Sequence, residues 1–377
     1  MKVKEKKVEL IELFYDLIYV YAISKMTLLI EEPIDGSVDP TRFFYYIVFS
    51  IIIIQSWLQM TNYVNRYGTW RWYEYIMTAT NMLAVVYLSV TITGEWTQYT
   101  AFTFNLSMIV MTLSVAILYA VQVHIDKQDP DAARSSLWIM GIVTAMYAFS
   151  LSITFSDYYD LALFTDILAV ILGGILPFIF RKSYDPAIIS FPHLTERLEL
   201  LTIITFGESI VGMTGFFDTE SASLVPVIIF AFVLLMFGNY VVQVHYIMNH
   251  HQIDDGKVLI YCHYFIILSV NIMTVALLYF ESTEADHLLT ALMLIFSQIL
   301  FYMALEATSY YSLPEFRFEW TDLVKSMVMV GIGSVIILVF LSSPYGFLIG
   351  ALMTSTGNFL IKSYKYSSNR CVNVIHT

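Results

Sequence analysis

Three carboxylic acids lie within apolar segments that are long enough to cross a lipid bilayer. Glu208 is near the middle of the segment 198–217, Asp16 lies in the segment 9–30, and Asp166 lies in the segment 159–180. A charged side chain at such a depth costs roughly 3 kcal/mol or more, so acids there usually pair with a cation or serve a function. We therefore predict that Asp16, Asp166 and Glu208 belong to a proton-binding or substrate-binding site.

Glu12 and Asp16 are four residues apart, which places them on the same face of a helix. Two desolvated carboxylates at this separation oppose each other's charge, so that one of them can hold a proton near neutral pH. The pair is therefore suited to a proton relay. Because Glu12 is close to the start of its segment, we expect it to be solvated among the lipid headgroups, whereas Asp16 is expected to be functional.

His193, Glu196 and Arg197 have the spacing i, i+3, i+4 and gather at the start of the segment 198–217. Two interpretations remain open. The three residues can form an ion-paired start of a helix, where an acid also favours the helix dipole. They can instead form a functional ion-pair or phosphate site together with Arg66, which follows the second apolar segment.

His263 lies about five residues into the segment 258–280. A histidine at this depth is either a titratable functional group or a partner in a hydrogen bond between helices. No zinc motif of the type His-Glu-x-x-His, no Gly-rich phosphate loop and no nucleophile motif occurs in the sequence. We therefore predict no metal, no cofactor and no catalytic triad.

The composition is that of an integral membrane protein. Hydrophobic residues make up 58% of the 377 residues and charged residues only 13%, compared with about 25% charged residues in soluble domains. Two cysteines are too few for a disulfide framework. The basic residues form no patch interleaved with aromatics, so nucleic acid is not an expected partner. The lipid bilayer is the expected partner, together with a small molecule, ion or lipid that the sequence does not identify.

Apolar windows of about 20 residues predict an all-α fold with about twelve transmembrane helices. Gly207 precedes Glu208 directly, which favours a locally broken helix in the segment 198–217. The predicted spans are approximately 9–30, 43–63, 72–93, 100–122, 135–156, 159–180, 198–217, 222–247, 258–280, 287–308, 322–341 and 344–361.

The distribution of charge predicts the orientation. With the N-terminus in the cytoplasm, Arg42 lies outside and Lys25 lies near the outer end of the first span, while every other lysine and arginine falls inside. The outer loops are acidic instead. This segregation follows the positive-inside rule and predicts a plasma-membrane protein with both termini in the cytoplasm. Five of the six tryptophans, including Trp57 and Trp70, fall near predicted span ends and are interpreted as an aromatic belt.

The sequence also indicates an internal repeat. A shift of 187 positions superimposes six identical residues between the start of the chain and the segment that begins at Glu196, and Lys182-Ser183-Tyr184 matches Lys362-Ser363-Tyr364 at the ends of the two halves. Six spans in each half give both halves the same orientation. We therefore predict two parallel six-helix repeats, 1–190 and 191–377, of the kind that rock around a central site in transporters.

Three stretches of the chain together resemble the low-temperature-requirement A (LtrA) family of bacterial membrane proteins. They are the run from Glu12 to Val20, the run Asn65-Arg66-Tyr67, and His193-x-x-Glu196-Arg197 with Gly207-Glu208-Ser209. The resemblance extends through most of the chain. It implies a set of functional positions but no substrate: Glu12, Asp16, Arg66, His193, Glu196, Arg197, Glu208 and His263.

Two functions from different classes are compatible with these features. A secondary transporter or permease, with proton coupling as one form, accounts for the acids at membrane depth, the parallel halves and the lack of soluble domains. A membrane enzyme acting on a lipid or polyprenyl substrate is the alternative. In that case His193, Glu196, Arg66 and Arg71 would bind a phosphate and supply acid–base chemistry at the cytoplasmic interface. The oligomeric state is left open.

Overall fold

The computed structural model describes residues 4–125, 130–156, 160–180, 186–217 and 223–375. Within these ranges the backbone forms helices and short connections, with isolated bridges at Ile34–Ser37 and Met248–Ser312 and no strand. The prediction of an all-α protein is thereby confirmed. One half of the predicted repeat motif, Lys182-Ser183-Tyr184, lies outside the described residues, and the two six-helix repeats stay a prediction.

The chain divides into two compact units. Unit 1 consists of Met1–Ile30, Asp39–Arg197 and Ile253–Asp255, and unit 2 consists of Glu31–Val38, Leu198–Gln252 and Gly256–Thr377. The boundary therefore falls inside helix α7, Phe191–Gly212, directly after Arg197. Residues from Phe191 to Arg197 belong to unit 1 and the remainder of the helix belongs to unit 2.

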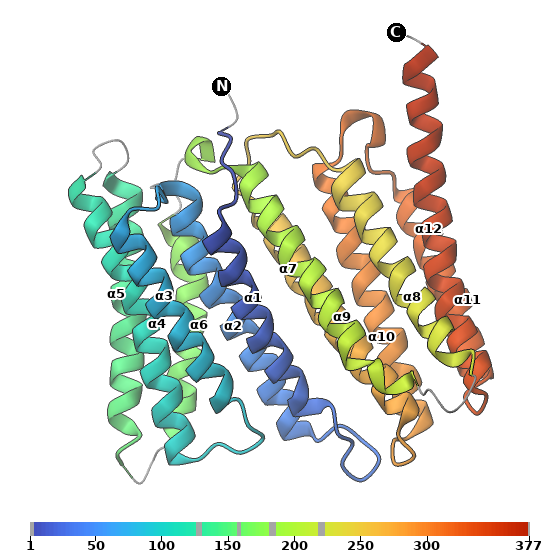
Figure 1. Cartoon of the computed structure of the whole chain (residues 1–377), viewed down its shortest axis with the longest axis horizontal. Helices are drawn as coiled ribbons and strands as arrows, with labels where there is room; N and C mark the ends of the chain where they lie inside the picture. The colour runs from blue at the N-terminus through green and yellow to red at the C-terminus, as the bar shows by residue number, and fades with distance from the viewer. Residues whose placement is uncertain (1–3, 126–129, 157–159, 181–185, 218–222, 376–377) are drawn as a thin grey trace. The chain divides into compact units, whose positions relative to one another are not determined.

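Unit 1 is a bundle of long helices that lie side by side (Figure 1). Helix α1 packs against α2 and α3, helix α4 against α2, α3 and α5, and helix α6 against α2, α4 and α5. Their bounds are α1 Leu10–Thr27, α2 Pro40–Tyr67, α3 Trp72–Thr91, α4 Gln98–Ile125, α5 Pro130–Ile153 and α6 Asp160–Ile179.

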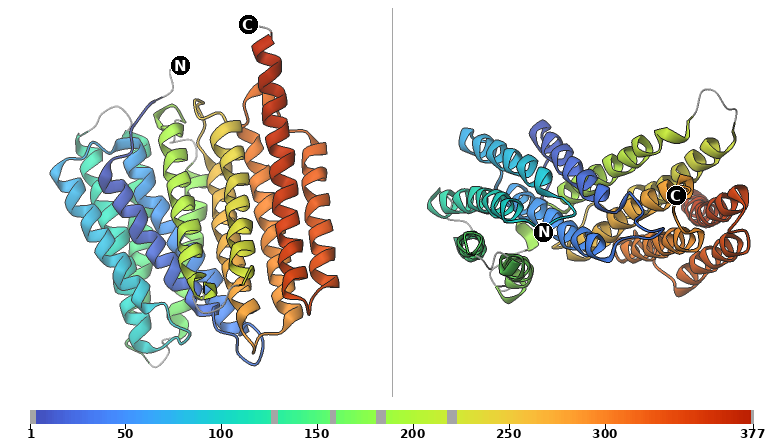
Figure 2. Two further views of the ribbon diagram at one scale, coloured as in Figure 1. Left: turned by 45° about the vertical axis from the view of Figure 1, so that its right-hand side comes forward. Right: turned by 90° about the horizontal axis from the view of Figure 1, so that it is seen from below.

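Unit 2 contains a second bundle in which α12 packs against α8 and α11. The C-terminal end of α12 extends beyond its neighbours in both side views (Figures 1 and 2). Helices α11 and α12 approach closely at two glycines, because a Cβ on Gly350 would lie 2.7 Å from the carbonyl oxygen of Gly333. The bounds are α8 Val225–Tyr240, α9 Lys257–Glu281, α10 His287–Ala307, α11 Trp320–Val339 and α12 Pro344–Ile375.

Length and composition identify membrane spans among these helices. Nine helical segments of the described chain are long and apolar enough to cross a bilayer; they comprise α1, α2, α4, α5 and α7 to α11, some with a short helical extension. The chain is thus a multi-pass membrane protein. Helices α3, α6 and α12 coincide with three further predicted spans, and their crossing of the bilayer stays a prediction.

The local break predicted in α7 is wrong. The helix continues through Gly207 to Gly212 without interruption. Irregular helical backbone occurs instead after α8, which continues as a π-helix over Val241–Ile247. A glycine permits a break but does not require one, and here the hydrogen bonds of α7 are completed through it.

Candidate functional site

A cluster of buried ionisable side chains lies in unit 1, where α1 and α7 begin and α2 ends. Arg197 is at its centre. Its Nε donates to Asp16 Oδ2 over 3.0 Å, its Nη2 donates to Asp16 Oδ1, and its Nη1 donates to Glu12 Oε2 over 3.0 Å. The three side chains are between 0% and 1% exposed. A single guanidinium therefore binds two carboxylates away from solvent, one of them bidentately.

Aromatic side chains complete the environment of Asp16. The indole nitrogen of Trp57 in α2 donates to Asp16 Oδ1 over 2.7 Å. The Arg197 guanidinium carbon lies 5.4 Å from the centre of a Trp57 ring and 5.7 Å from that of Tyr15, within the range of cation–π attraction. Asp16 thus accepts three hydrogen bonds, and the positive charge is enclosed by rings as well as by carboxylates.

Glu12 has a less symmetrical set of donors. Its Oε2 lies 3.0 Å from Arg197 Nη1 and 2.8 Å from His193 Nε2. Its Oε1 accepts two longer bonds, from the Trp70 indole and from the Glu9 backbone N–H, both of 3.3 Å. Trp70 has a φ of +55°, a conformation that a bulky residue rarely adopts. Such strain persists where the surrounding contacts demand it, and here it accompanies the bond to Glu12.

The protonation of His193 is determined by its neighbours. The Asn65 side-chain amide donates to the Ser190 carbonyl over 2.8 Å and accepts from the Ser190 N–H over 2.9 Å, which fixes its orientation. The amide nitrogen of Asn65 is therefore also the donor to His193 Nδ1, which lies 3.1 Å away. Since Nδ1 accepts, the ring is neutral and its proton is on Nε2, facing Glu12.

The segment before α1 covers the end of this cluster. Lys4 Nζ donates to the carbonyl oxygens of Arg66 and Ile188, over 2.7 Å and 3.1 Å. Lys6 Nζ donates to the carbonyls of Val64 and Gly68, the latter over 3.0 Å. Burial lowers the pKa of Lys6 to about 8, against the attraction of Glu12, which raises it. The segment is thereby fixed across the end of α2.

All residues of the Glu12–Asp16–His193–Arg197 cluster lie within the part of the chain that matches a known protein family. The bacterial low temperature requirement A protein (LtrA) family matches residues 7–356 of the chain. The chain belongs to the LtrA family. The expectation drawn from the three sequence stretches is thus confirmed, and membership agrees with a membrane protein built of multiple apolar helices. No curated protein matches the chain.

The structure of this LtrA family protein brings Glu12, Asp16, His193 and Arg197 together. The expectation that Glu12 is solvated is wrong, because the side chain is 1% exposed and bonded to Arg197. Glu196, on the same helix, is exposed and lies away from the cluster. Arg66 contributes its backbone carbonyl to Lys4, and its side chain is half-buried.

Three other predicted residues lie elsewhere. Asp166 is fully buried and its Oδ2 accepts from Asn105 over 3.2 Å, while Oδ1 has no hydrogen-bond partner among the described residues. Glu208 is exposed and lies about three turns beyond Arg197 along α7. His263 is buried, with Nδ1 donating to the Leu259 carbonyl over 2.8 Å and Nε2 accepting from the Tyr240 hydroxyl over 3.0 Å. The geometry at His263 is that of a hydrogen bond between α8 and α9.

Sequence reasoning missed Trp57, Trp70 and Asn65. The indole N–H groups of the two tryptophans donate to Asp16 and Glu12, and the belt prediction is wrong for Trp57, which is buried within unit 1. Trp57 lies almost three turns before the end of α2, a position that argues against a role at the interface. Asn65 stands beside Arg66 in the motif, and its amide nitrogen lies 3.1 Å from His193 Nδ1. Among the described residues, no group of three His, Cys, Asp or Glu side chains is arranged to hold a metal.

Proposed function

We propose that this protein is a proton-coupled secondary transporter in which the Glu12–Asp16–His193–Arg197 cluster binds and releases a proton. The observation that carries the proposal is the charge of the cluster. Two carboxylates face one guanidinium, and the hydrogen bond from Asn65 keeps His193 neutral. One negative charge therefore has no partner within the four side chains. A proton is the smallest ligand that neutralises it.

Glu12 is the group that we expect to accept this proton. Asp16 is held by a bidentate guanidinium and the Trp57 indole, so a proton there would displace short bonds. The Oε1 oxygen of Glu12 has only two donors at 3.3 Å. Protonation of His193 at Nδ1 would require the Asn65 amide to turn, with loss of both its bonds to Ser190. The carboxyl group of Glu12 is the less costly site.

Protonation of Glu12 would change the connection between two helices. The carboxylate now joins α1 to α7 through Arg197 and His193. A neutral Glu12 would keep only weak bonds to both, leaving Asp16 as the charged link between the helices. Gain or loss of one proton would thus alter how tightly the start of α7 is held to α1, which is the kind of coupling a proton-driven conformational cycle requires.

The alternative of a membrane enzyme has less support. It requires His193, Glu196, Arg66 and Arg71 to converge on a substrate phosphate. His193 is fully buried beneath the Lys4–Lys6 segment, whereas Glu196 and Arg71 are exposed. Both ring nitrogens of His193 already have a neighbour. Asn65 donates to Nδ1, and Nε2 lies 2.8 Å from Glu12 Oε2. These residues therefore offer no common open surface for a phosphate.

Orientation and repeat belong to the same proposal. The segregation of lysine and arginine supports both termini in the cytoplasm of the cell, and the paired motifs support two parallel halves. In that orientation the Glu12 end of unit 1 faces the cytoplasm. A proton would then be exchanged with the cytoplasmic side.

The proposal can be tested by infrared spectroscopy on purified protein in lipid vesicles. A carboxylic-acid carbonyl band should appear and disappear with pH in the natural protein and be absent in Glu12→Gln. Glu196→Gln is the matched control, because it changes an exposed acid on a helix of the cluster and should keep the band. Proton uptake by the same vesicles under an imposed membrane potential should follow the band. A pH-dependent band that survives in both Glu12→Gln and Asp16→Asn would refute the cluster as the proton site.

A further inference from the structure

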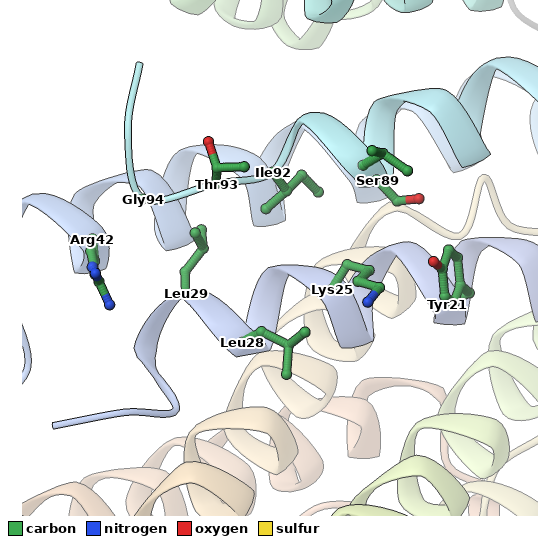
Figure 3. Close-up of a pocket in the computed structure, with 10 residues that line it drawn as sticks. Tyr21, Lys25, Leu28, Leu29, Arg42, Ser89, Ile92, Thr93 and Gly94 are labelled. Atoms are coloured by element: carbon green, nitrogen blue, oxygen red, sulfur yellow. The ribbon is translucent and has the colours of Figure 1, made fainter. Parts of the chain in front are cut away.

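A cavity lies at the other end of unit 1, between the end of α1, the start of α2 and the end of α3. Its volume is about 380 Å³. Figure 3 shows Lys25 and Tyr21 on one side and Arg42 towards the other, with Ser89 and Thr93 along the α3 side. The volume falls within the range of small-molecule sites.

The charge of the cavity has one sign. Lys25 and Arg42 both line it, and none of its lining residues is acidic. Within the described part of the chain, no carboxylate forms an ion pair with either cation. Lys25 Nζ lies 5.7 Å from the centre of the Tyr21 ring, and Asp39 bonds to the backbone N–H of Arg42 rather than to its guanidinium. Two cations without a counter-charge create an anion site.

The cavity is shaped by a glycine that brings Arg42 close to the backbone. A Cβ at position 94 would lie 3.0 Å from Arg42 Nε and 3.5 Å from its Cδ. Gly94 thus leaves room for the guanidinium to lie against the chain after α3. A planar guanidinium is suited to bind two oxygens of one phosphate group.

The walls of the cavity are apolar as well as cationic. Leu28 and Val90 line it and are 49% and 67% exposed. In a membrane protein such side chains face acyl chains, so an amphiphile could place its headgroup at the cations and its tail along this wall. The same two cations are the ones that depart from the charge segregation of the sequence, since Lys25 and Arg42 fall at the acidic side.

We propose that this cavity binds a phosphate-type anion, carried either by a lipid headgroup or by free phosphate. Lys25 supplies a point charge and Arg42 a planar guanidinium that can donate two parallel hydrogen bonds. This inference is independent of the proposed proton site and of transport.

Purified protein in a neutral detergent tests the proposal. The apparent melting temperature is measured at increasing concentrations of phosphatidylglycerol, phosphatidylcholine or inorganic phosphate. If the site binds a lipid headgroup, the melting temperature should rise to a plateau with phosphatidylglycerol. If it binds the free anion, the same rise should occur with inorganic phosphate. Loss of one charge-assisted contact should weaken half-saturation about tenfold in Lys25→Gln and in Arg42→Gln.

Arg134→Gln is the matched control, because Arg134 is exposed, forms a 3.9 Å ion pair with Asp131 and does not line the cavity. It should respond as the natural protein does. Arg42→Lys keeps the positive charge but loses the planar guanidinium, so its half-saturation concentration should lie between those of the natural protein and Arg42→Gln. Absence of a response to both anionic probes, an equal response to phosphatidylcholine, or a shift unchanged in Lys25→Gln and Arg42→Gln would each overturn the proposal.

Discussion

Each unit of the protein buries a cluster of charged side chains, and the two clusters differ in balance. In unit 1 one arginine faces two carboxylates beside a neutral histidine. In unit 2 Lys362 of α12 pairs with Glu306 of α10 and also donates to Gln243 over 3.1 Å. Both residues of that pair are 5% exposed. The pair is neutral, whereas the four side chains of the unit 1 cluster contain two carboxylates and one guanidinium, with Lys6 as a further cation that attracts Glu12.

We propose that this difference in balance separates a structural ion pair in unit 2 from a functional cluster in unit 1. A buried one-to-one pair satisfies its own charges and needs nothing further, apart from hydrogen bonds to its remaining atoms. Gln243 supplies one of these bonds from the π-helical turn, while its own amide donates to Ser309 over 2.9 Å. A cluster with an unpaired charge is stable only if something else compensates for it. The LtrA match, residues 7–356, includes all of the unbalanced cluster and ends before Lys362.

The largest effect is expected from Arg197→Gln. The variant leaves two buried carboxylates without a cation, and should lose roughly 3–5 kcal/mol of stability. Equilibrium unfolding in mixed detergent micelles, followed by tryptophan fluorescence, measures the loss. Arg134→Gln removes an exposed arginine and should change stability by no more than about 0.5 kcal/mol. Equal losses in the two variants would contradict the central place of Arg197.

A second set of variants tests the balance itself. Lys362→Met should cost about 3 kcal/mol because it leaves Glu306 buried and unpaired. Addition of Glu306→Gln to Lys362→Met should recover most of the lost stability, since no buried charge of the pair remains. In unit 1, addition of Asp16→Asn to Arg197→Gln should restore only part, because Glu12 is still charged. Full recovery there with one neutralised acid would mean that the two clusters have the same balance.

The smallest effect is expected from the pH dependence of Lys6. Its pKa falls from 10.5 to about 8 in the folded protein because burial disfavours the charged form. Between these values the unfolded chain binds more protons than the folded one, so stability should rise as pH increases from about 8 towards 10.5. Lys6→Met should flatten this rise, while Lys7→Met, which changes an exposed neighbour, should not. A rise that is equal in all three proteins would exclude Lys6 as its source.

The sequence predicts the elements of this protein better than their contacts. Apolar windows locate the helices because the bilayer demands about 20 apolar residues for each crossing. The depth of Asp16 and its need for a cationic partner follow from the same argument. The identity of that cation cannot be predicted in this way, because Arg197 is 181 positions away in the sequence and only packing brings the two residues together.

Two misreadings have a common physical cause. The predictions for Glu12 and Trp57 rest on their positions along a span, which specify depth but not direction around the helix. Glu12 turns towards Arg197 and so is buried rather than solvated, and Trp57 turns towards Asp16 rather than towards the interface. The direction of a side chain around a helix is decided by neighbours from distant sequence. The π-helix at Val241–Ile247 is equally invisible, since no proline or glycine lies within it.

The long separation between the members of the unit 1 cluster has a consequence for biosynthesis. Glu12 and Asp16 leave the ribosome well before Arg197, His193 and the Ser190 backbone that binds the side chain of Asn65. At a typical elongation rate the interval is about 10–40 s. During that time α1 enters the membrane with two acids that have no guanidinium to bind. A chain that ends before position 197 never gains the guanidinium that binds these two acids. Nascent chains arrested before and after that point should therefore differ sharply in their survival against membrane proteases.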